Sequence, residues 1–268
     1  MLLRGKKILL TGATGGIGRH LALQLAAEGA ELALVCFDAE KLQALAAEIG
    51  TQGGKAAVIV ADFTHAHAAE GVAEAAMIKL RGVDILINNA GILDFIMFAE
   101  QEPKRIAQMV QINLTVPMQL TRALLPGFMA LNSGQIVNIG SMFGSIGFPH
   151  HACYSATKFG MRGFSQALRR ELAGRDIAVT YVAPRAVKTP LNDLATAAMQ
   201  KATGTNVDAP EAVAEKIIAA IKRGNGDVYI GQPESFFAWL NGFLPALVSM
   251  GLKKKTAIAA HYASRKQP

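Results

Sequence analysis

The residues in this sequence that could do acid–base chemistry are a tyrosine and a lysine four positions apart, Tyr154 and Lys158. Four positions make about one turn of an α-helix, so both side chains would leave the same helix face. A free tyrosine titrates near pH ~10, and a neighbouring ammonium stabilises the tyrosinate, which lowers the pKa of the phenol. Such a pair could give or take a proton near neutral pH.

A glycine-rich turn is the second candidate for chemistry. The apolar run Ile8 to Leu10 leads directly into Thr11-Gly12-Ala13-Thr14-Gly15-Gly16-Ile17-Gly18. Glycine lets the backbone turn sharply and approach a ligand closely, and the free amides at the start of a following helix favour a diphosphate. The spacing differs from the common G-x-G-x-x-G. Taken alone, the turn could also be a tight strand-to-helix connection.

These groups need a scaffold, and the sequence alternates short apolar runs with segments of helical periodicity. We expect strands over residues 8–10, 32–36, 56–60, 83–87, 135–139, 177–182 and 227–230. We expect helices over residues 17–28, 42–49, 66–81, 103–131, 152–173 and 213–221. Seven apolar strands separated by helices indicate an α/β protein with a doubly wound Rossmann fold, a seven-stranded parallel sheet flanked by helices.

Polar residues follow several of the expected strands. Asp62 closes the third strand, Asn88-Asn89-Ala90-Gly91 closes the fourth, and Ser141 follows the fifth. Open parallel sheets bind ligands at the carboxyl ends of their strands. These residues could therefore face one crevice together with Tyr154 and Lys158.

In order and spacing, these elements resemble the short-chain dehydrogenase/reductase family over residues 6 to about 231. The matching elements are Thr11 to Gly18, Asp62, Asn88 to Gly91, Asn113, Ser141, Tyr154-x-x-x-Lys158 and Pro184 to Thr189. The resemblance implies an NAD(P)-dependent oxidoreductase that interconverts a secondary alcohol and a ketone by hydride transfer at the nicotinamide. Two alternatives are a non-catalytic dinucleotide-binding sensor and a membrane-associated interaction module. A sensor could dispense with the serine, tyrosine and lysine, and this chain retains all three.

The resemblance also assigns roles to single residues. Tyr154 would be the acid/base, Ser141 would orient the carbonyl, and Asn113 would hold a water of a proton relay. Lys158 would bind the ribose and, with the positive nicotinamide ring, lower the pKa of the tyrosine. The expected cofactor-binding residues are Gly12, Thr14, Gly15, Gly16, Ile17, Gly18, Asp38, Asp62 at the adenine, Asn89, Ala90, Gly91, Tyr154, Lys158, Pro184, Val187, and Thr189 at the carboxamide. We expect no metal site, because the paired histidines are spaced too closely for a usual zinc site.

Two positions depart from the family pattern. The family often has Pro-Gly where this chain has Pro184-Arg185. The arginine could narrow the pocket or bind an anionic group of the substrate, but a solvent-facing side chain is the favoured interpretation. Cys153 precedes the tyrosine, and packing of a small residue is favoured there over a reactive thiol.

The choice between NAD and NADP is usually decided after the second strand. An acid there binds the ribose hydroxyl of NAD, whereas an arginine suits the 2′-phosphate of NADP. In this chain Cys36 takes the acid position and Phe37 the arginine position. Asp38 lies one step further along and could also cap the next helix. Because no basic residue lies in this segment, the sequence favours NAD.

Positive charge is concentrated near the C-terminus. The chain has 27 Lys+Arg against 20 Asp+Glu, a net charge of +7, and five of the basic residues follow position 252 without any acid: Lys253, Lys254, Lys255, Arg265 and Lys266. A nearly balanced remainder argues against a nucleic-acid partner and favours a local anionic partner, such as a membrane surface. The two cysteines suit a reducing compartment. We therefore expect a cytoplasmic protein, with the inner membrane surface as an alternative place.

The segment before these lysines is apolar. Ser235 to Leu252 carries no charge, but Pro245 interrupts it, so we expect two short helices, the second opening at Pro245, rather than a spanning helix. We expect residues 1–232 to form the dinucleotide-binding and catalytic domain and residues 233–268 a helical extension with a basic tail.

The apolar stripe of this extension has several interpretations. It could pack on the fold, cover the substrate pocket, form a subunit interface, or contact a membrane through residues 235–255. A pocket bordered by Phe236, Phe237 and Trp239 would favour a hydrophobic substrate, such as an acyl, lipid-like or steroid-like compound. The family resemblance implies homo-oligomers, dimers or tetramers, formed through residues 103–131 and 152–173.

Overall fold

The computed structural model describes residues 1–224 and 226–263. Its strands form where aliphatic residues run almost without charge, because a parallel sheet is buried on both faces. The strands are β1 (Lys7–Thr11), β2 (Glu31–Cys36), β3 (Lys55–Val60), β4 (Ile85–Asn88), β5 (Gly134–Ile139), β6 (Ile177–Pro184) and β7 (Gly226–Ile230). They pair in the order β3-β2-β1-β4-β5-β6-β7, and every pair is parallel. The predicted seven-stranded, doubly wound sheet is confirmed.

Two layers of helices cover the sheet. The helices are α1 (Gly16–Ala27), α2 (Ala39–Thr51), α3 (Ala68–Leu80), α4 (Pro103–Val110), α5 (Val116–Leu131), α6 (Ala152–Glu171), α7 (Leu194–Ala202), α8 (Pro210–Arg223), α9 (Glu234–Asn241) and α10 (Pro245–Ala263). Side chains alternate along each strand, so Ile8 and Leu10 join one core under α1, α2 and α8. Leu9 joins a second core under α3, α5 and α6.

Two helical regions differ from the sequence-based expectation. Residues 103–131 do not form one helix, because a π-helical turn, η2 (Gln111–Thr115), separates α4 from α5. Helix α7 is not among the expected helices. It begins after Asp193, whose carboxylate accepts a hydrogen bond from the Thr196 amide at 2.7 Å, a regular N-cap.

The last helix of the C-terminal extension is also longer than expected. Helix α10 opens at Pro245, as predicted, but it is not short: it continues through the three lysines to Ala263. Lysine and alanine are strong helix formers, so nothing in this stretch stops the helix. Arg265 and Lys266 lie outside the described residues. Within the described part of the chain, no helix combines the length and apolar character needed to cross a membrane.

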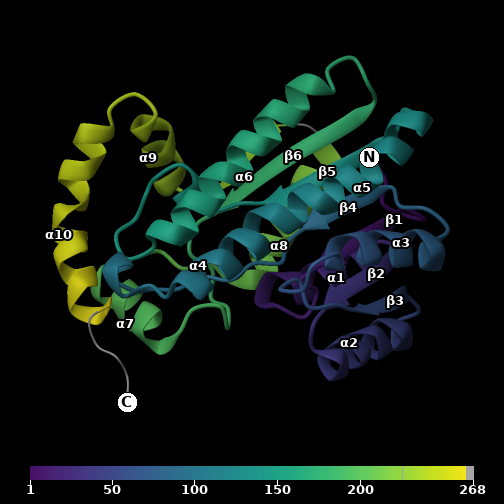
Figure 1. Ribbon diagram of the computed structural model, residues 1–268, viewed down its shortest axis with the longest axis horizontal. Coiled ribbons are helices and arrows are strands. Elements are labelled where there is room, and N and C mark those ends of the chain that lie inside the picture. The colour runs from purple at the N-terminus through teal and green to yellow at the C-terminus, as the bar shows by residue number, and fades with distance from the viewer. Residues whose placement is uncertain (225, 264–268) are drawn as a thin grey trace.

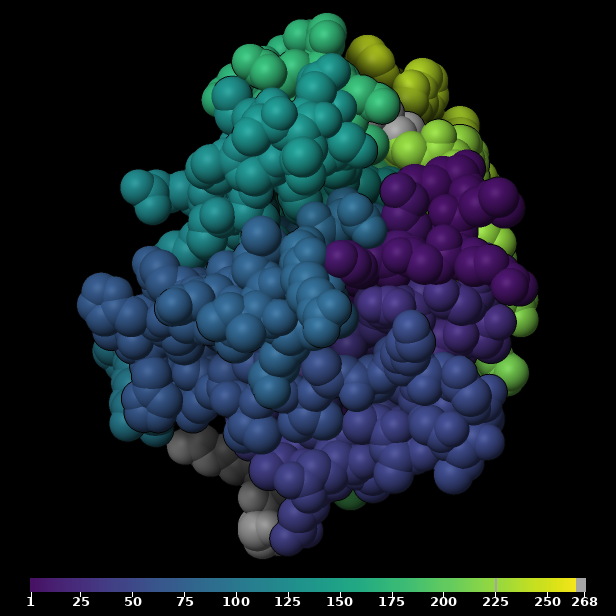
Figure 2. Space-filling view, turned by 90° about the vertical axis from the view of Figure 1, so that its right-hand side faces the viewer, coloured from purple at the N-terminus to yellow at the C-terminus, as the bar shows by residue number. Residues whose placement is uncertain are grey.

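The extension lies at one end of the molecule. In Figure 1, α10 forms the outer left edge and runs from α9 down to α7, while α2 and α3 lie on the opposite side. Figure 2, seen from that opposite side, shows a surface covered mainly by the purple and blue first half of the chain. The extension therefore lies at the opposite end of the molecule from α2 and α3.

A buried chain of polar side chains holds α6 on the sheet. The Asn88 amide donates to the Asn138 side-chain oxygen at 2.9 Å, and the Asn138 amide donates to the Ser165 hydroxyl at 2.9 Å. These residues come from β4, β5 and α6 respectively. Removal of one of these side chains would leave a buried partner without its hydrogen bond, which is unfavourable. The three linked side chains therefore fix the position of α6 over β4 and β5.

The expectation that Arg185 faces solvent is wrong. Its guanidinium forms two hydrogen bonds with the Asp208 carboxylate, at 2.7 and 3.0 Å, and a third with Glu234 at 3.0 Å. The Arg185 and Asp208 side chains are only 17% and 15% exposed. Both acids hold the pKa of the guanidinium above its ordinary value. Arg185 therefore ties the end of β6 to the loop before α8 and to the first residue of α9.

We predict that Arg185→Ala lowers the free energy of unfolding by about 1–3 kcal/mol, because two half-buried carboxylates lose their partner. Urea unfolding of the full chain measures this change. The matched control is Arg170→Ala, which removes an exposed arginine and is expected to change stability by less than about 0.5 kcal/mol. Equal stability of the two variants would contradict the proposed tie.

Candidate functional site

The glycine turn lies where the strand order changes direction. β1 pairs with β2 on one side and with β4 on the other, so the loops after β1 and β4 meet. The Thr11 hydroxyl accepts hydrogen bonds from the Asn89 and Ala90 amides, both at 3.0 Å. The Asn89 side chain in turn donates to the carbonyls of Thr11 and Gly12 at 3.1 Å. The structure thus brings two of the expected cofactor-binding segments together.

The glycines of this turn have no room for a side chain. Gly12 has φ +63°, and a Cβ there would lie 2.8 Å from the Ala90 Cα atom. A Cβ on Gly18 would collide with the Gly12 carbonyl oxygen, and one on Gly16 would collide with the Thr189 side chain. The close approach to Thr189 also places the loop after β6 against the turn. Only glycine satisfies these positions.

The start of α1 is suited to an anion. Its N-cap residue is Gly15, no side chain caps the helix, and its first turn contains no acidic residue. The amide groups at this end are therefore not satisfied by side chains, and the helix dipole adds a partial positive charge. Ile17, in the first turn, is half-buried against the core beneath. A dinucleotide diphosphate fits this cradle.

The residues after β2 and β3 lie beside the turn. The Ala61 amide donates to the Cys36 carbonyl at 3.0 Å, and the Thr14 hydroxyl lies 2.8 Å from the Cys36 sulfur. Phe37 is exposed. Asp38 caps α2, accepting from the Lys41 amide at 3.1 Å and forming an ion pair with the Lys41 ammonium at 2.7 Å. The hydrogen bond from the Lys41 side chain lowers the pKa of Asp38.

Asp62 lies in the loop after β3. One of its carboxylate oxygens accepts a hydrogen bond from the Thr64 amide at 2.9 Å, and this bond lowers the pKa of Asp62. The other oxygen forms a loose ion pair with His65 at 3.8 Å. Because the carboxylate is about half exposed, a bound ligand could still contact it at this edge.

The loop after β6 completes the cofactor side. Pro184 is the last residue of β6, Val187 is buried and forms a parallel bridge with Asp208, and Thr189 touches Gly16. The backbone of Lys188 also bonds to Asp208 at 2.9 Å. The loop is therefore held by the same aspartate that pairs with Arg185. This use of the arginine is a feature that the sequence analysis missed.

Ser141 is held from behind by a buried tyrosine. Ser141 precedes the short 3₁₀ turn η3 (Met142–Gly144), and its hydroxyl accepts a hydrogen bond from the Phe143 amide at 3.1 Å. The Tyr181 hydroxyl, fully buried on β6, donates to the Ser141 carbonyl at 3.3 Å. Side chains at Gly140 and Gly144 would collide with the Tyr181 ring or hydroxyl. Tyr181 therefore sets the position of the serine.

Tyr154 is buried in the first turns of α6, in reach of Ser141. Burial raises the pKa of its phenol to about 12, although a hydrogen bond with the Ser141 side chain opposes the rise. This direction is opposite to the one expected from the sequence. Without a bound cofactor, the free-energy cost of burying a tyrosinate is larger than the stabilisation that its neighbours give it. The phenol is thus fully protonated at neutral pH and ready to donate.

Lys158 lies one helical turn further along and is also buried. Its ammonium donates to the Ile139 carbonyl at 2.9 Å and lies 5.6 Å from the centroid of the Tyr154 ring. Burial lowers the pKa of this ammonium to about 8. A Cβ built on Gly91 would lie 3.8 Å from the ammonium nitrogen, so the loop after β4 closes one side. An ammonium has three donors, which leaves two for ribose hydroxyls.

Asn113 sits in the π-helical turn and is buried. Its side-chain amide donates to the Ile92 carbonyl at 2.8 Å, and its side-chain oxygen accepts from the Ile92 amide at 2.8 Å. A further bond reaches the Thr157 hydroxyl at 3.2 Å. Three hydrogen bonds therefore fix the orientation of this side chain. π turns recur at functional sites.

An aromatic cluster beside Tyr154 is a second feature that the sequence analysis missed. His151 stacks on Phe95 with ring centroids 5.0 Å apart, and Phe143 stacks on Phe148 at 5.1 Å. Phe143 also meets the Tyr154 ring edge-on at 6.2 Å. Burial lowers the pKa of His151 to about 4, so the imidazole is neutral. The nearness of these residues to positions 141 and 154 in the sequence is the signal that could have found them.

The aromatic rings of the C-terminal extension form a separate cluster. Phe236 contacts Phe237 and Trp239, and these rings share no ring contact with the Tyr154 cluster among the described residues. The surroundings of Tyr154 thus come from the loops after β4 and β5 rather than from α9. The extension reaches the surroundings of the site through α9, where the Asn241 amide donates to the Ser145 carbonyl at 2.8 Å, and through α10, where Ala259 and Ala263 pack with Phe95.

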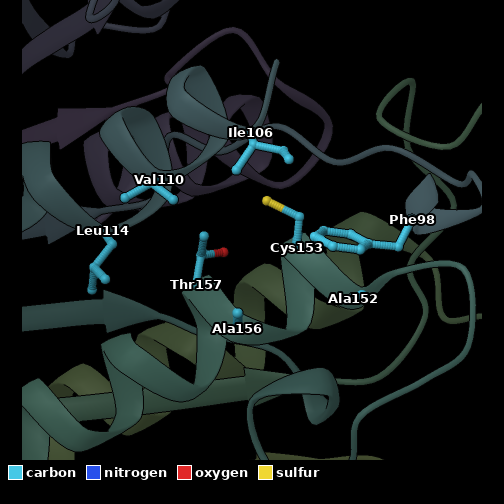
Figure 3. A pocket seen from close by; sticks show the side chains of 8 residues that line it. All are labelled: Phe98, Ile106, Val110, Leu114, Ala152, Cys153, Ala156 and Thr157. Carbon is cyan, nitrogen blue, oxygen red and sulfur yellow. The ribbon is translucent and has the colours of Figure 1, made fainter. Parts of the chain in front are cut away.

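An apolar groove lies on the other side of α6. It has a volume of about 370 Å³ and is open to solvent, and Figure 3 shows the Cys153 sulfur pointing into it, between α4 and α6. Its lining residues are Phe98, Ile106, Val110, Leu114, Ala152, Cys153, Ala156 and Thr157. Burial raises the pKa of the Cys153 thiol, which disfavours the reactive thiolate. Cys153 therefore packs as a small apolar residue.

Comparisons with known proteins agree with this geometry. The family model described as short chain dehydrogenase matches residues 6–200. Nodulation protein G of Rhizobium sp. (strain N33) is 36% identical over 221 residues, which is 79% of this chain and 89% of that protein. The 3-oxoacyl-[acyl-carrier-protein] reductase FabG of Haemophilus influenzae is 33% identical over 207 residues, 77% of this chain and 84% of that protein.

Solved structures are similar over the same region. A putative NAD(P)-dependent gluconate 5-dehydrogenase from Beutenbergia cavernae with bound NADP has a TM-score of 0.75 and 30% identity, covering 85% of this chain and 95% of that chain. A metagenomic short-chain oxidoreductase in complex with NADP has a TM-score of 0.72 and 27% identity, covering 86% and 99%. The chain therefore belongs to the short-chain dehydrogenase/reductase family and is an NAD(P)-dependent oxidoreductase.

Proposed function

We propose that this oxidoreductase interconverts a secondary alcohol and a ketone on a hydrophobic substrate. The observation that carries this proposal is the apolar setting of Tyr154: Phe143 meets its ring edge-on, and the neutral His151 contacts Phe143 in turn. Arg185 is fully engaged by acids, so it does not offer a charge to an anionic substrate. Apolar walls favour acyl, lipid-like or steroid-like compounds.

In the proposed reaction, a bound nicotinamide supplies or accepts the hydride. Ser141 donates a hydrogen bond to the carbonyl oxygen, and Tyr154 donates its phenolic proton to that oxygen as the alcohol forms. The raised pKa of the phenol keeps this proton in place at neutral pH. Lys158 holds the ribose through its free donors and stabilises the tyrosinate left after transfer. Asn113 holds the water that returns a proton to the tyrosine.

We propose that residues 1–232 form the domain that binds the cofactor and carries the reaction, with residues 233–268 as its extension. The glycine turn, Asn89 to Gly91 and the loop from Pro184 to Thr189 would bind the dinucleotide. Asp62 would contact the adenine. The proposed place of action is the cytoplasm, with the inner membrane surface as the alternative.

NAD is the proposed cofactor. Cys36 and Phe37 stand where a basic side chain would recognise the 2′-phosphate of NADP, and Lys41 is paired with Asp38. The two similar solved structures contain NADP, so direct comparison of both cofactors is needed. Asp38 would contact the ribose hydroxyls through the carboxylate that also caps α2.

We predict that a screen of ketones of increasing acyl chain length gives a rising kcat/KM, by up to about fourfold per added methylene until the pocket is filled. The loss of NADH absorbance measures each rate, and parallel assays with NADPH are expected to be slower. Activity confined to small polar ketones would reject the hydrophobic substrate. A strong preference for NADPH would reject the proposed cofactor alone.

We predict that Tyr154→Phe reduces turnover by at least about 10²-fold, because the proton donor is lost. Cofactor binding, followed by quenching of protein fluorescence, should persist, since many other groups hold the dinucleotide. Tyr262→Phe is the matched control, because Tyr262 lies on α10, where its ring contacts His261; it should retain most activity. Near-normal turnover by the Tyr154 variant would refute its role.

A homo-oligomer is the proposed assembly, formed through the face of α4, α5 and α6. The groove shown in Figure 3 continues this apolar face toward a second groove of about 250 Å³ between α5 and α6, lined in part by Met118, Met129 and Phe164. Exposed apolar surface of this kind is typical of subunit contacts. A second copy of the chain would bury it.

We predict that the wild-type chain elutes as a multiple of its 28.3 kDa mass in size-exclusion chromatography with light scattering. Val110→Glu combined with Met118→Glu should yield the single-chain mass, because two carboxylates would be desolvated in the contact. Met77→Glu, at an exposed apolar position on α3, is the control and should leave the mass unchanged. An unchanged mass of the double variant would place the contact elsewhere.

A further inference from the structure

We propose that the outer side of α9 and of the first half of α10 is a docking surface for an anionic membrane. This surface, called here the C-terminal apolar face, consists of large apolar side chains that are each more than half exposed. They are Phe236, Trp239, Phe243, Leu244, Leu247 and Met250. The inference goes beyond the reaction proposed above, and membrane binding is measured separately from activity.

The C-terminal apolar face is continuous across the break between the two helices. The Trp239 ring lies 5.9 Å from the Phe236 ring and 5.2 Å from the Phe243 ring, measured between centroids. Large contiguous apolar patches are uncommon on soluble proteins and mark contact sites. Tryptophan and phenylalanine are also the side chains that partition best into the membrane interface.

The face points away from the rest of the protein. The side of α10 that packs inward carries Val248, Ala259 and Ala263, and its neighbours there are α7 and α9. In Figure 1, α10 forms the outermost edge of the molecule, with no element beyond it. The exposed side chains could therefore enter a flat surface without rearrangement of the fold.

Charge identifies the kind of surface. Lys253 and Lys254 follow Met250 by three and four residues, so they continue the same side of the helix, and both are exposed. No Asp or Glu occurs from Ser235 to Ala263. Lysines next to an immersed apolar face can place their ammonium groups among anionic headgroups. The combination fits an interfacial contact with a lipid surface.

A second copy of the chain fits this face less well. In a two-fold contact, the same patch meets itself. The lysines would then approach either the lysines or the apolar side chains of the other copy, with no acid in this segment to neutralise them. A membrane with anionic lipids has no such conflict. Among the described residues, no helix is long and apolar enough to cross a membrane. This finding is compatible with a helix that lies along the membrane interface.

The inner side of α10 connects this surface to the candidate site. Ala259 and Ala263 pack with Phe95 and Met199, and Phe148 borders the same cluster. Phe95 and Phe148 also surround His151 next to Tyr154. Docking would therefore place the apolar surroundings of the site beside the lipid. This step rests on the proposed hydrophobic substrate, which would then enter from the bilayer.

The experiment is co-sedimentation of the full-length protein with vesicles, either of phosphatidylcholine alone or with one third phosphatidylglycerol. Binding is expected only with the anionic vesicles. Trp239→Ser/Phe243→Ser/Leu247→Ser should weaken it at least about tenfold. Lys253→Gln/Lys254→Gln should weaken it by roughly fivefold per lysine, and added salt should have a similar effect.

Two control variants accompany this experiment. Leu2→Ser/Met77→Ser/Ile78→Ser removes three exposed apolar side chains far from α10 along the chain, and Lys79→Gln/Lys216→Gln removes two exposed lysines. Both should bind like the wild type, and thermal unfolding checks that every variant folds. Absence of wild-type binding, or equal binding by the apolar variant, would overturn the inference. A drop in oligomer mass of the apolar variant without vesicle binding would assign the face to another copy instead.

Discussion

Burial of the Lys158 ammonium is the constraint on which the site depends. A pKa lowered from 10.5 to about 8 corresponds to a cost on the order of 3 kcal/mol for keeping this charge out of water. The fold tolerates the cost because the Ile139 carbonyl accepts one of the three donors. Tyr154 and Gly91 lie beside the ammonium, and a ribose bound there would complete its remaining donors.

The neighbouring groups hold the ammonium and the elements around it in place. The hydrogen-bonded chain from Asn88 through Asn138 to Ser165 fixes α6, which carries both Tyr154 and Lys158. Gly91 leaves room beside the ammonium, and Asn113 fixes the loop that contains Gly91. The same burial that lowers the pKa of Lys158 raises the pKa of Tyr154. The two shifts therefore have one cause, and together they favour a protonated phenol next to a charge that can stabilise its anion.

Local patterns predicted the parts of this arrangement that depend on neighbours in sequence. The four-residue spacing of Tyr154 and Lys158, the glycine turn and the seven strands follow from periodicity and from polar residues at strand ends. The partners of Arg185 could not be predicted in this way, because Asp208 and Glu234 lie 23 and 49 residues away in the chain. The raised pKa of Tyr154 depends on its burial, to which residues far away in the chain contribute. The single-residue roles and the domain division stay predictions.

The π-helical turn between α4 and α5 has a consequence for how this region can change in length. Such a turn holds one residue more than the α-helix would, and Asn113 points inward because of that extra residue. Loss of one residue anywhere from Gln111 to Thr115 would restore regular winding and rotate α4 by about 100° relative to α5. The asparagine would leave Ile92, and the groove side of α4 would turn away from α6. Substitutions can therefore be accommodated in this segment, but insertions and deletions cannot.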